Sequence, residues 1–229
     1  MTITSSTLTR AAGVAAVTAG LLFIGVQFNH PHLDVTSINT TEVVIRNSLK
    51  ALMAVLALVG ITGMYLSQAR RNGLPGLIGY LLLAGGYLLI MSTTLIAASV
   101  LPLVAGSDPG FVTDAIALAT GGTASGDLGL MHYLNKAQDL GYLLGGLIFG
   151  IALYRAHVLA RWASALLALG GGVTIALSVM PDAFYRLLAL PNGIAMIGLG
   201  YSLWSTARPS HDPQTATVSS RPDATAVAA

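Results

Sequence analysis

The stretch LPGLIGYLLLAGGYLLIMSTTLIAASVLPLV, residues 74–104, is apolar along most of its length and contains no charged side chain. A helix needs about 20 apolar residues to cross the roughly 30 Å hydrocarbon core of a bilayer. Pro75 stands in the first turn of such a helix, where its missing N–H has no helical partner to lose. The stretch therefore predicts a long transmembrane helix.

Similar apolar stretches recur through the rest of the chain. Hydrophobic residues make up 54% of the sequence and charged residues only 9%, whereas a soluble domain carries roughly 25% charged residues. The other predicted spans are residues 11–28, 48–66 (in a helix that begins near Glu42), 138–154, 162–180 and 187–204. We therefore predict an all-α membrane protein, a bundle of about six transmembrane helices.

This transmembrane domain takes up residues 11–204, between a short N-terminus (1–10) and a tail (205–229). We interpret the first span as an uncleaved anchor, because the residues that follow it, QFNHP at 27–31, offer no small-residue cleavage site. The tail is rich in Ser, Thr, Pro and Ala. Such a segment cannot bury a core, so we predict that it is disordered.

Lys and Arg are unevenly divided between the two predicted sides of the membrane. Six spans place Arg10, Arg70, Arg71, Arg155, Arg161, Arg208 and Arg221 on one side, and Arg46, Lys50, Lys136 and Arg186 on the other. Positive residues favour the cytoplasmic side. Both termini are therefore predicted to be cytoplasmic, with outer loops at 29–47 and 105–137.

The longer outer loop carries signals of its own. Residues 111–120 predict a short amphipathic helix on the outer surface. Asp127 is a candidate N-cap for a second helix, which we expect to run through His132 and Lys136 into the fourth span. Pro191 near the start of the sixth span predicts a broken or displaced first turn there.

Several function classes are disfavoured by composition. The chain has no cysteine, which excludes disulfides, thiolate zinc sites and thiol catalysis. Its net charge of +2 gives no reason to expect nucleic acid as a partner. No acidic or basic residue lies near the middle of a predicted span, where such a group would mark an ion path or a catalytic centre. We expect no cofactor.

The remaining polar candidates gather at the predicted outer rim. His30, His32 and Asp34 alternate, so an extended segment would point them the same way, and imidazole and carboxylate are metal ligands. The candidate catalytic residues are His132, Asp139, Glu42 and Asp182, if they line one cavity. The simpler interpretation is that loop residues outside a bilayer must be polar, and that Glu42 and Arg46 form an ordinary i,i+4 pair.

A stripe of hydroxyl-bearing residues marks the third span. Tyr80, Tyr87 and Thr94 are spaced seven apart and so share one helix face. They could line a polar pocket. The alternative, which we favour, is interhelical hydrogen bonding, because buried hydroxyl groups need partners in lipid.

Small residues recur four apart in two spans. Span four carries Gly141, Gly145, Gly146 and Gly150, and span one carries Ala12, Ala16 and Gly20. This spacing lets helix backbones approach closely. It could form a dimerisation face, but packing within one bundle is the interpretation that we favour.

One block of sequence carries a family resemblance. GYLLGGLIFGIALYR at 141–155, followed by VLARW at 158–162, resembles families of uncharacterised bacterial multi-pass membrane proteins, and so does LTRAAG at 8–13. The resemblance implies a multi-pass protein of the bacterial inner membrane. It carries no activity and no functional residue over to this chain.

The sequence leaves three functions open. The first is binding of a lipid, a small hydrophobic molecule or a membrane partner within the bundle, with membrane lipids and either another copy of the chain or a membrane protein as partners. The second is a membrane-embedded enzyme acting on a lipid or isoprenoid-like substrate at the outer leaflet. The third is a small transporter or export helper. We favour the first, because no catalytic constellation stands out.

Overall fold

A computed structural model describes residues 4–28, 33–177 and 183–207, and side chains are described outside 173–189. Every regular element in these ranges is a helix. The elements are α1 (Ser5–Gly25), η1 (Ser37–Asn39), α2 (Thr41–Ser67), α3 (Ala69–Ser99), α4 (Leu101–Val104), α5 (Pro109–Ala119), α6 (Leu130–Ala156), α7 (Arg161–Leu177) and α8 (Ala183–Thr206).

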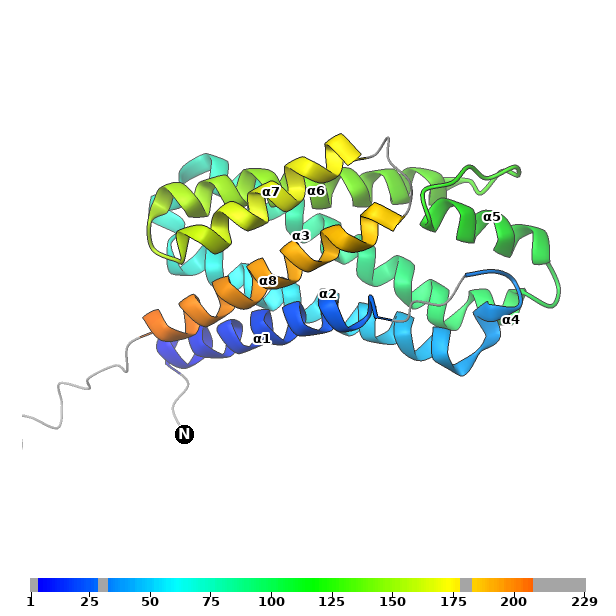
Figure 1. Cartoon of the computed structure of the whole chain (residues 1–229), viewed down its shortest axis with the longest axis horizontal. Coiled ribbons are helices and arrows are strands. Elements are labelled where there is room, and N and C mark those ends of the chain that lie inside the picture. Colours follow the sequence, from blue (N-terminus) through cyan, green and yellow to red (C-terminus); the bar gives the residue numbers. More distant parts are fainter. Residues whose placement is uncertain (1–3, 29–32, 178–182, 208–229) are drawn as a thin grey trace, which may run out of the picture.

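The long helices run roughly along one axis of an elongated bundle (Figure 1). Within it, α3 packs along α6, α1 packs along both α8 and α2, and α7 joins α6 to α8. Among the described residues, four segments are long and apolar enough to cross a membrane, namely Ser5–Gly25, Thr41–Ser67, Ala69–Val104 and Leu130–Ala156. The prediction of an all-helical chain suited to a membrane is confirmed at this level.

The helix boundaries follow local chemistry. Helix α1 begins at Ser5 because the Thr4 hydroxyl accepts the N–H of Thr7 at 3.3 Å, which satisfies a donor that the first turn leaves free. Helix α5 lies where the sequence predicted a short outer helix. Helix α6 runs unbroken from Leu130 through His132, as expected, but Gly129 and not Asp127 occupies its N-cap position. The predicted break at Pro191 is wrong, because α8 continues through that residue.

Helix α3 is interrupted near its start at one glycine. Gly73 has φ 58° and ψ −160°, which interrupts the helix just before Leu74 and Pro75. A side chain at such a positive φ would clash with its own backbone, whereas glycine adopts this conformation readily. The break separates the turn at 69–72 from the predicted third span.

Small residues bring α3 and α6 into close contact. A Cβ added to Gly145 would meet the backbone of Leu83, and one added to Gly79 would meet the backbone of Phe149. Another pair of helices, α1 and α8, meets in the same way, because a Cβ on Gly13 would collide with Gly200. The small-residue spacing therefore serves packing inside one chain, as we expected.

Two apolar clusters stabilise opposite parts of the bundle. The main core lies among the long helices and buries Tyr87, Phe149 and Leu199 almost completely. A second cluster joins η1, the start of α2, α4 and α5; its buried members are Ile38, Val43, Leu101, Ala105, Val112, Ala115 and Ile116. This second cluster lies at the end of the bundle opposite the start of α1 and the end of α8 (Figure 1).

The loop after α5 is anchored by one carboxylate. Asp114 accepts the Ser125 N–H at 2.9 Å, the Gly126 N–H at 2.8 Å and the Ser125 hydroxyl at 2.9 Å. These hydrogen bonds favour the charged form and hold the pKa of the Asp114 carboxyl below its usual range. Each bond therefore ties the loop to α5 at neutral pH.

Charge is separated along the bundle. Arg10, Arg70, Arg71, Arg155 and Arg161 belong to the end where α1 begins, α2 meets α3 and α6 meets α7. The acidic residues within the described ranges belong to the other half; they are Asp34, Glu42, Asp108, Asp114, Asp127 and Asp139. Arg46, Lys50 and Lys136 lie in that half as well.

Candidate functional site

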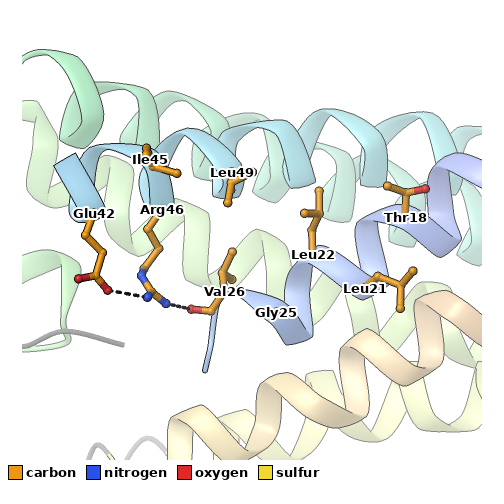
Figure 2. Close-up of a pocket in the computed structure, with 9 residues that line it drawn as sticks. All are labelled: Thr18, Leu21, Leu22, Gly25, Val26, Glu42, Ile45, Arg46 and Leu49. Carbon is orange, nitrogen blue, oxygen red and sulfur yellow. Dashed lines mark hydrogen bonds and ion pairs between the residues drawn. The ribbon is translucent and has the colours of Figure 1, made fainter. Parts of the chain in front are cut away.

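An open groove of about 540 Å³ lies between α1 and α2 (Figure 2). Its volume falls in the range of small-molecule sites, roughly 300–1,000 Å³. The lining residues are Thr18, Leu21, Leu22, Gly25, Val26, Glu42, Ile45, Arg46 and Leu49. Residues 18–25 of α1 and 42–49 of α2 each cover about 10 Å of helix axis, so the groove is longer than a single side chain.

The walls of the groove are apolar. Leu21, Ile45 and Leu49 contribute side chains that stay substantially exposed, as lipid-facing side chains do. Gly25 leaves its part of the wall open, because a Cβ built there meets no heavy atom within 4 Å. The result is a recess with apolar sides that opens on the surface of the bundle.

One end of the groove is charged. Arg46 donates from one guanidinium nitrogen to the carbonyls of Val26 (2.8 Å) and Phe28 (2.9 Å), and from the other to Glu42 at 2.9 Å. Figure 2 shows this side chain reaching from α2 across to the end of α1. These two carbonyls lie just after Gly25, the last residue of α1, where backbone acceptors have no helical partner and a cation is favourable. Arg46 thus joins the two helices that form the groove.

The candidate catalytic residues are not gathered in this groove. Of those described, only Glu42 lines it. His132 packs edge-on against Tyr133 at 5.7 Å between ring centroids, and Asp139 is exposed two turns further along α6. Asp182 lies outside the described residues.

Asp34 is part of a tight turn. Its carboxylate accepts the Thr36 hydroxyl at 2.7 Å and the backbone N–H groups of Ser37 (2.7 Å) and Thr36 (2.9 Å). These bonds, the Thr36 hydroxyl foremost, lower the pKa of the Asp34 carboxyl to about 2. The other two candidate metal ligands, His30 and His32, lie outside the described residues. Within the described ranges no group of three His, Cys, Asp or Glu side chains could hold a metal ion.

The hydroxyl stripe on α3 lies against neighbouring helices. The Tyr80 hydroxyl is 3.1 Å from that of Thr62, and its ring stacks on Tyr65 with centroids 4.8 Å apart. Tyr87 is 1% exposed and meets the ring of Tyr142 edge-on. The third member, Thr94, donates to the Ile90 carbonyl of its own helix at 2.7 Å.

Sequence reasoning missed the groove. It recognised Glu42 and Arg46 as an i,i+4 pair, but the carbonyl of Val26 lies 20 residues before Arg46. A charged residue about one turn into a helix, just before its apolar span and soon after the end of the preceding span, is the signal that could have indicated a helix-joining contact.

The fold and the groove together define a class: a protein whose described part is helical, with four segments there that are long and apolar enough to cross a membrane and an open apolar recess between two of them. Comparisons with protein-family models, with curated proteins and with solved structures each returned no match.

Proposed function

We propose that this chain is an integral membrane protein that binds a lipid or another small hydrophobic molecule in the groove between α1 and α2. The observation that carries the proposal is the combination of an apolar recess with one charged end. Burying apolar surface stabilises a complex by roughly 25 cal/mol per Å² when it removes that surface from water. Lipid chains are as apolar as the groove, so in a bilayer the shape of the groove and its polar end must determine which molecule binds.

The charged end suits a polar head group. Arg46 can donate and Glu42 can accept, and their mutual ion pair keeps the net local charge small. This arrangement matches a molecule whose head group has both hydrogen-bond donors and acceptors. Its apolar chain would be about 10 Å long or longer. Membrane lipids are the proposed partners.

Filling the groove should abolish binding. Gly25→Leu adds a side chain where a Cβ meets nothing within 4 Å, so the chain should fold while the new side chain occupies the recess. We expect native mass spectrometry of the detergent-purified chain to show a co-purifying adduct for the wild type and its loss, by roughly tenfold in occupancy or more (about 1.4 kcal/mol), for Gly25→Leu.

Gly85→Leu is the matched control, because Gly85 on α3 is also free of neighbours within 4 Å of an added Cβ and lies outside the groove. It should retain the adduct. A wild-type chain that is purified without any bound molecule, or equal adducts on both variants, would contradict the proposal.

The proposed topology has six spans in a bacterial inner membrane, with α7 and α8 as the fifth and sixth. Both termini are on the cytoplasmic side. The support is the arginine-rich end described above, because Lys and Arg favour the cytoplasmic side. Helix α8 also packs along α1, a candidate span, for much of its length.

Single cysteines can test this topology, since the native chain has none. A cysteine replacing Thr120 should react with an impermeant thiol reagent in intact cells, and one replacing Arg70 should react only after the membrane is opened. The reverse pattern would invert the topology, and equal labelling of both positions would exclude a membrane between them.

A further inference from the structure

A second cavity, of about 520 Å³, lies at the arginine-rich end, away from the groove. It forms where α2 meets α3, beside the turn between α6 and α7. Its lining residues are Leu66, Ser67, Gln68, Ala69, Arg70, Arg71 and Val158.

The backbone places these side chains by specific local contacts. The Gln68 carbonyl accepts the N–H groups of Arg71 (2.9 Å) and Asn72 (3.0 Å), so a new helical turn begins directly after α2 ends. On the other side, α6 ends at Ala156. The next residue, His157, has a positive φ of 55°, and Val158 follows at the cavity wall. The turn between α2 and α3 and the turn between α6 and α7 therefore border the same cavity.

Gln68 is the unexpected member of this lining. It is 3% exposed, and neither its amide nitrogen nor its amide oxygen has a hydrogen-bond partner among the described residues. Native structures leave few buried polar side-chain atoms without a partner. Gln68 lines the cavity, so this unpartnered donor and acceptor can serve a ligand once the side chain turns toward it.

Asn72, one helical turn after Gln68, is also buried without a hydrogen-bond partner for its side chain among the described residues. It is 5% exposed. The glycine at position 76 makes room for it, because a Cβ there would overlap the Asn72 side chain. Two buried amides thus lie next to a pair of exposed arginines.

We propose that this cavity binds a phosphate group, with the Gln68 amide as a buried donor and the guanidinium groups of Arg70 and Arg71 as cationic donors. Arginine matches the oxygen geometry of phosphate. The Gln68 amide oxygen accepts from a hydroxyl or ammonium group carried by the same ligand. Leu66 and Val158 supply an apolar wall. Both a phospholipid head group and free phosphate have this chemistry, and the site is independent of the groove.

The test uses the full-length chain in detergent and measures its thermal unfolding midpoint by tryptophan fluorescence. One titration adds inorganic phosphate, and the other adds a short-chain phosphatidylglycerol. Saturable stabilisation by phosphate indicates a free-anion site, and stabilisation by the lipid alone indicates a head-group site. If neither ligand raises the midpoint, the proposal is overturned.

Paired variants separate a built site from general surface charge. Arg70→Gln together with Arg71→Gln should weaken binding roughly tenfold or more (about 1.4 kcal/mol). The control, Arg155→Gln with Arg161→Gln, removes the same charge from the same end but outside the cavity lining, and it should bind as the wild type does. Equal loss in both double variants overturns the proposal.

Gln68→Leu tests the buried amide without changing charge. The variant should bind the ligand several-fold more weakly, while its midpoint without ligand stays the same or rises because two unpartnered polar atoms have been removed. Unchanged binding overturns the role of Gln68. A lower midpoint without ligand overturns it too, because the amide would then serve only the fold.

Discussion

Replacing Gly145 with alanine should destabilise the protein, whereas the same replacement at Gly85 should stabilise it slightly. The two glycines lie in α6 and α3, and alanine is the better helix former by about 1 kcal/mol. Their surroundings differ, because a Cβ on Gly145 would meet the backbone of Leu83 and one on Gly85 meets nothing within 4 Å.

The size of the effect at Gly145 follows from what must move. A flexible side chain could rotate away, but the backbone of α3 can yield only if the two helices separate and lose dispersion contacts along their interface. Overpacking of this kind costs about 1–3 kcal/mol, and we expect Gly145→Ala to lie near the upper limit. Reversible unfolding by sodium dodecyl sulfate in mixed micelles measures the difference.

Gly79→Ala should reproduce the result from the other helix, because its added Cβ would meet the backbone of Phe149. Gly85→Ala controls for helix propensity alone. If Gly145 and Gly85 tolerated alanine equally well, α3 and α6 could not be in the close contact described here.

The second large effect should come from Arg46. Its guanidinium donates to the carbonyls of Val26 and Phe28, and its side chain is only 15% exposed. Hydrogen bonds that involve a charged group contribute about 1.5–3 kcal/mol each, and the exposed bond to Phe28 should contribute less than the partly buried bond to Val26. We therefore expect Arg46→Gln to lower the free energy of unfolding by roughly 3 kcal/mol, measured by the same unfolding titration.

Glu42→Gln should have a much smaller effect, although it removes the partner of the same ion pair. The Glu42 side chain is 54% exposed, and exposed i,i+4 pairs contribute about 0.3–0.5 kcal/mol. Arg46→Lys keeps the charge but lacks the planar fork that reaches several acceptors, so it should be intermediate. Equal losses for Arg46→Gln and Glu42→Gln would show that the ion pair, rather than the contact with α1, carries the stability.

The helices and their approximate positions could be predicted from the sequence because the causes are local. An apolar run of about 20 residues must form a helix in lipid, since no water is present to satisfy its backbone groups. The predicted start near Glu42 lies close to the observed start of α2 at Thr41. The short helix α5 likewise depends on neighbouring residues. Pro191 misled the same reasoning, because helix packing retains a helical path through it.

Close helix contacts could be predicted in kind but not in detail. The glycine spacing of 141–150 indicated that some backbone would approach, while the tertiary structure decided that Leu83 on α3 meets Gly145. The position of Arg46 signalled at most a contact between two helices. The open groove itself could not be predicted, because its two walls come from helices whose relative placement depends on the whole bundle.

The sequence by itself determined that the chain forms long apolar helices with its arginines concentrated toward one end, since hydropathy and charge act residue by residue. The tertiary structure alone decided that Arg46 reaches the end of α1, that an open recess remains beside Gly25, and that the Gln68 amide is buried at a cavity wall. Such features depend on distances between segments far apart in the chain, and those distances are set only when the helices pack together.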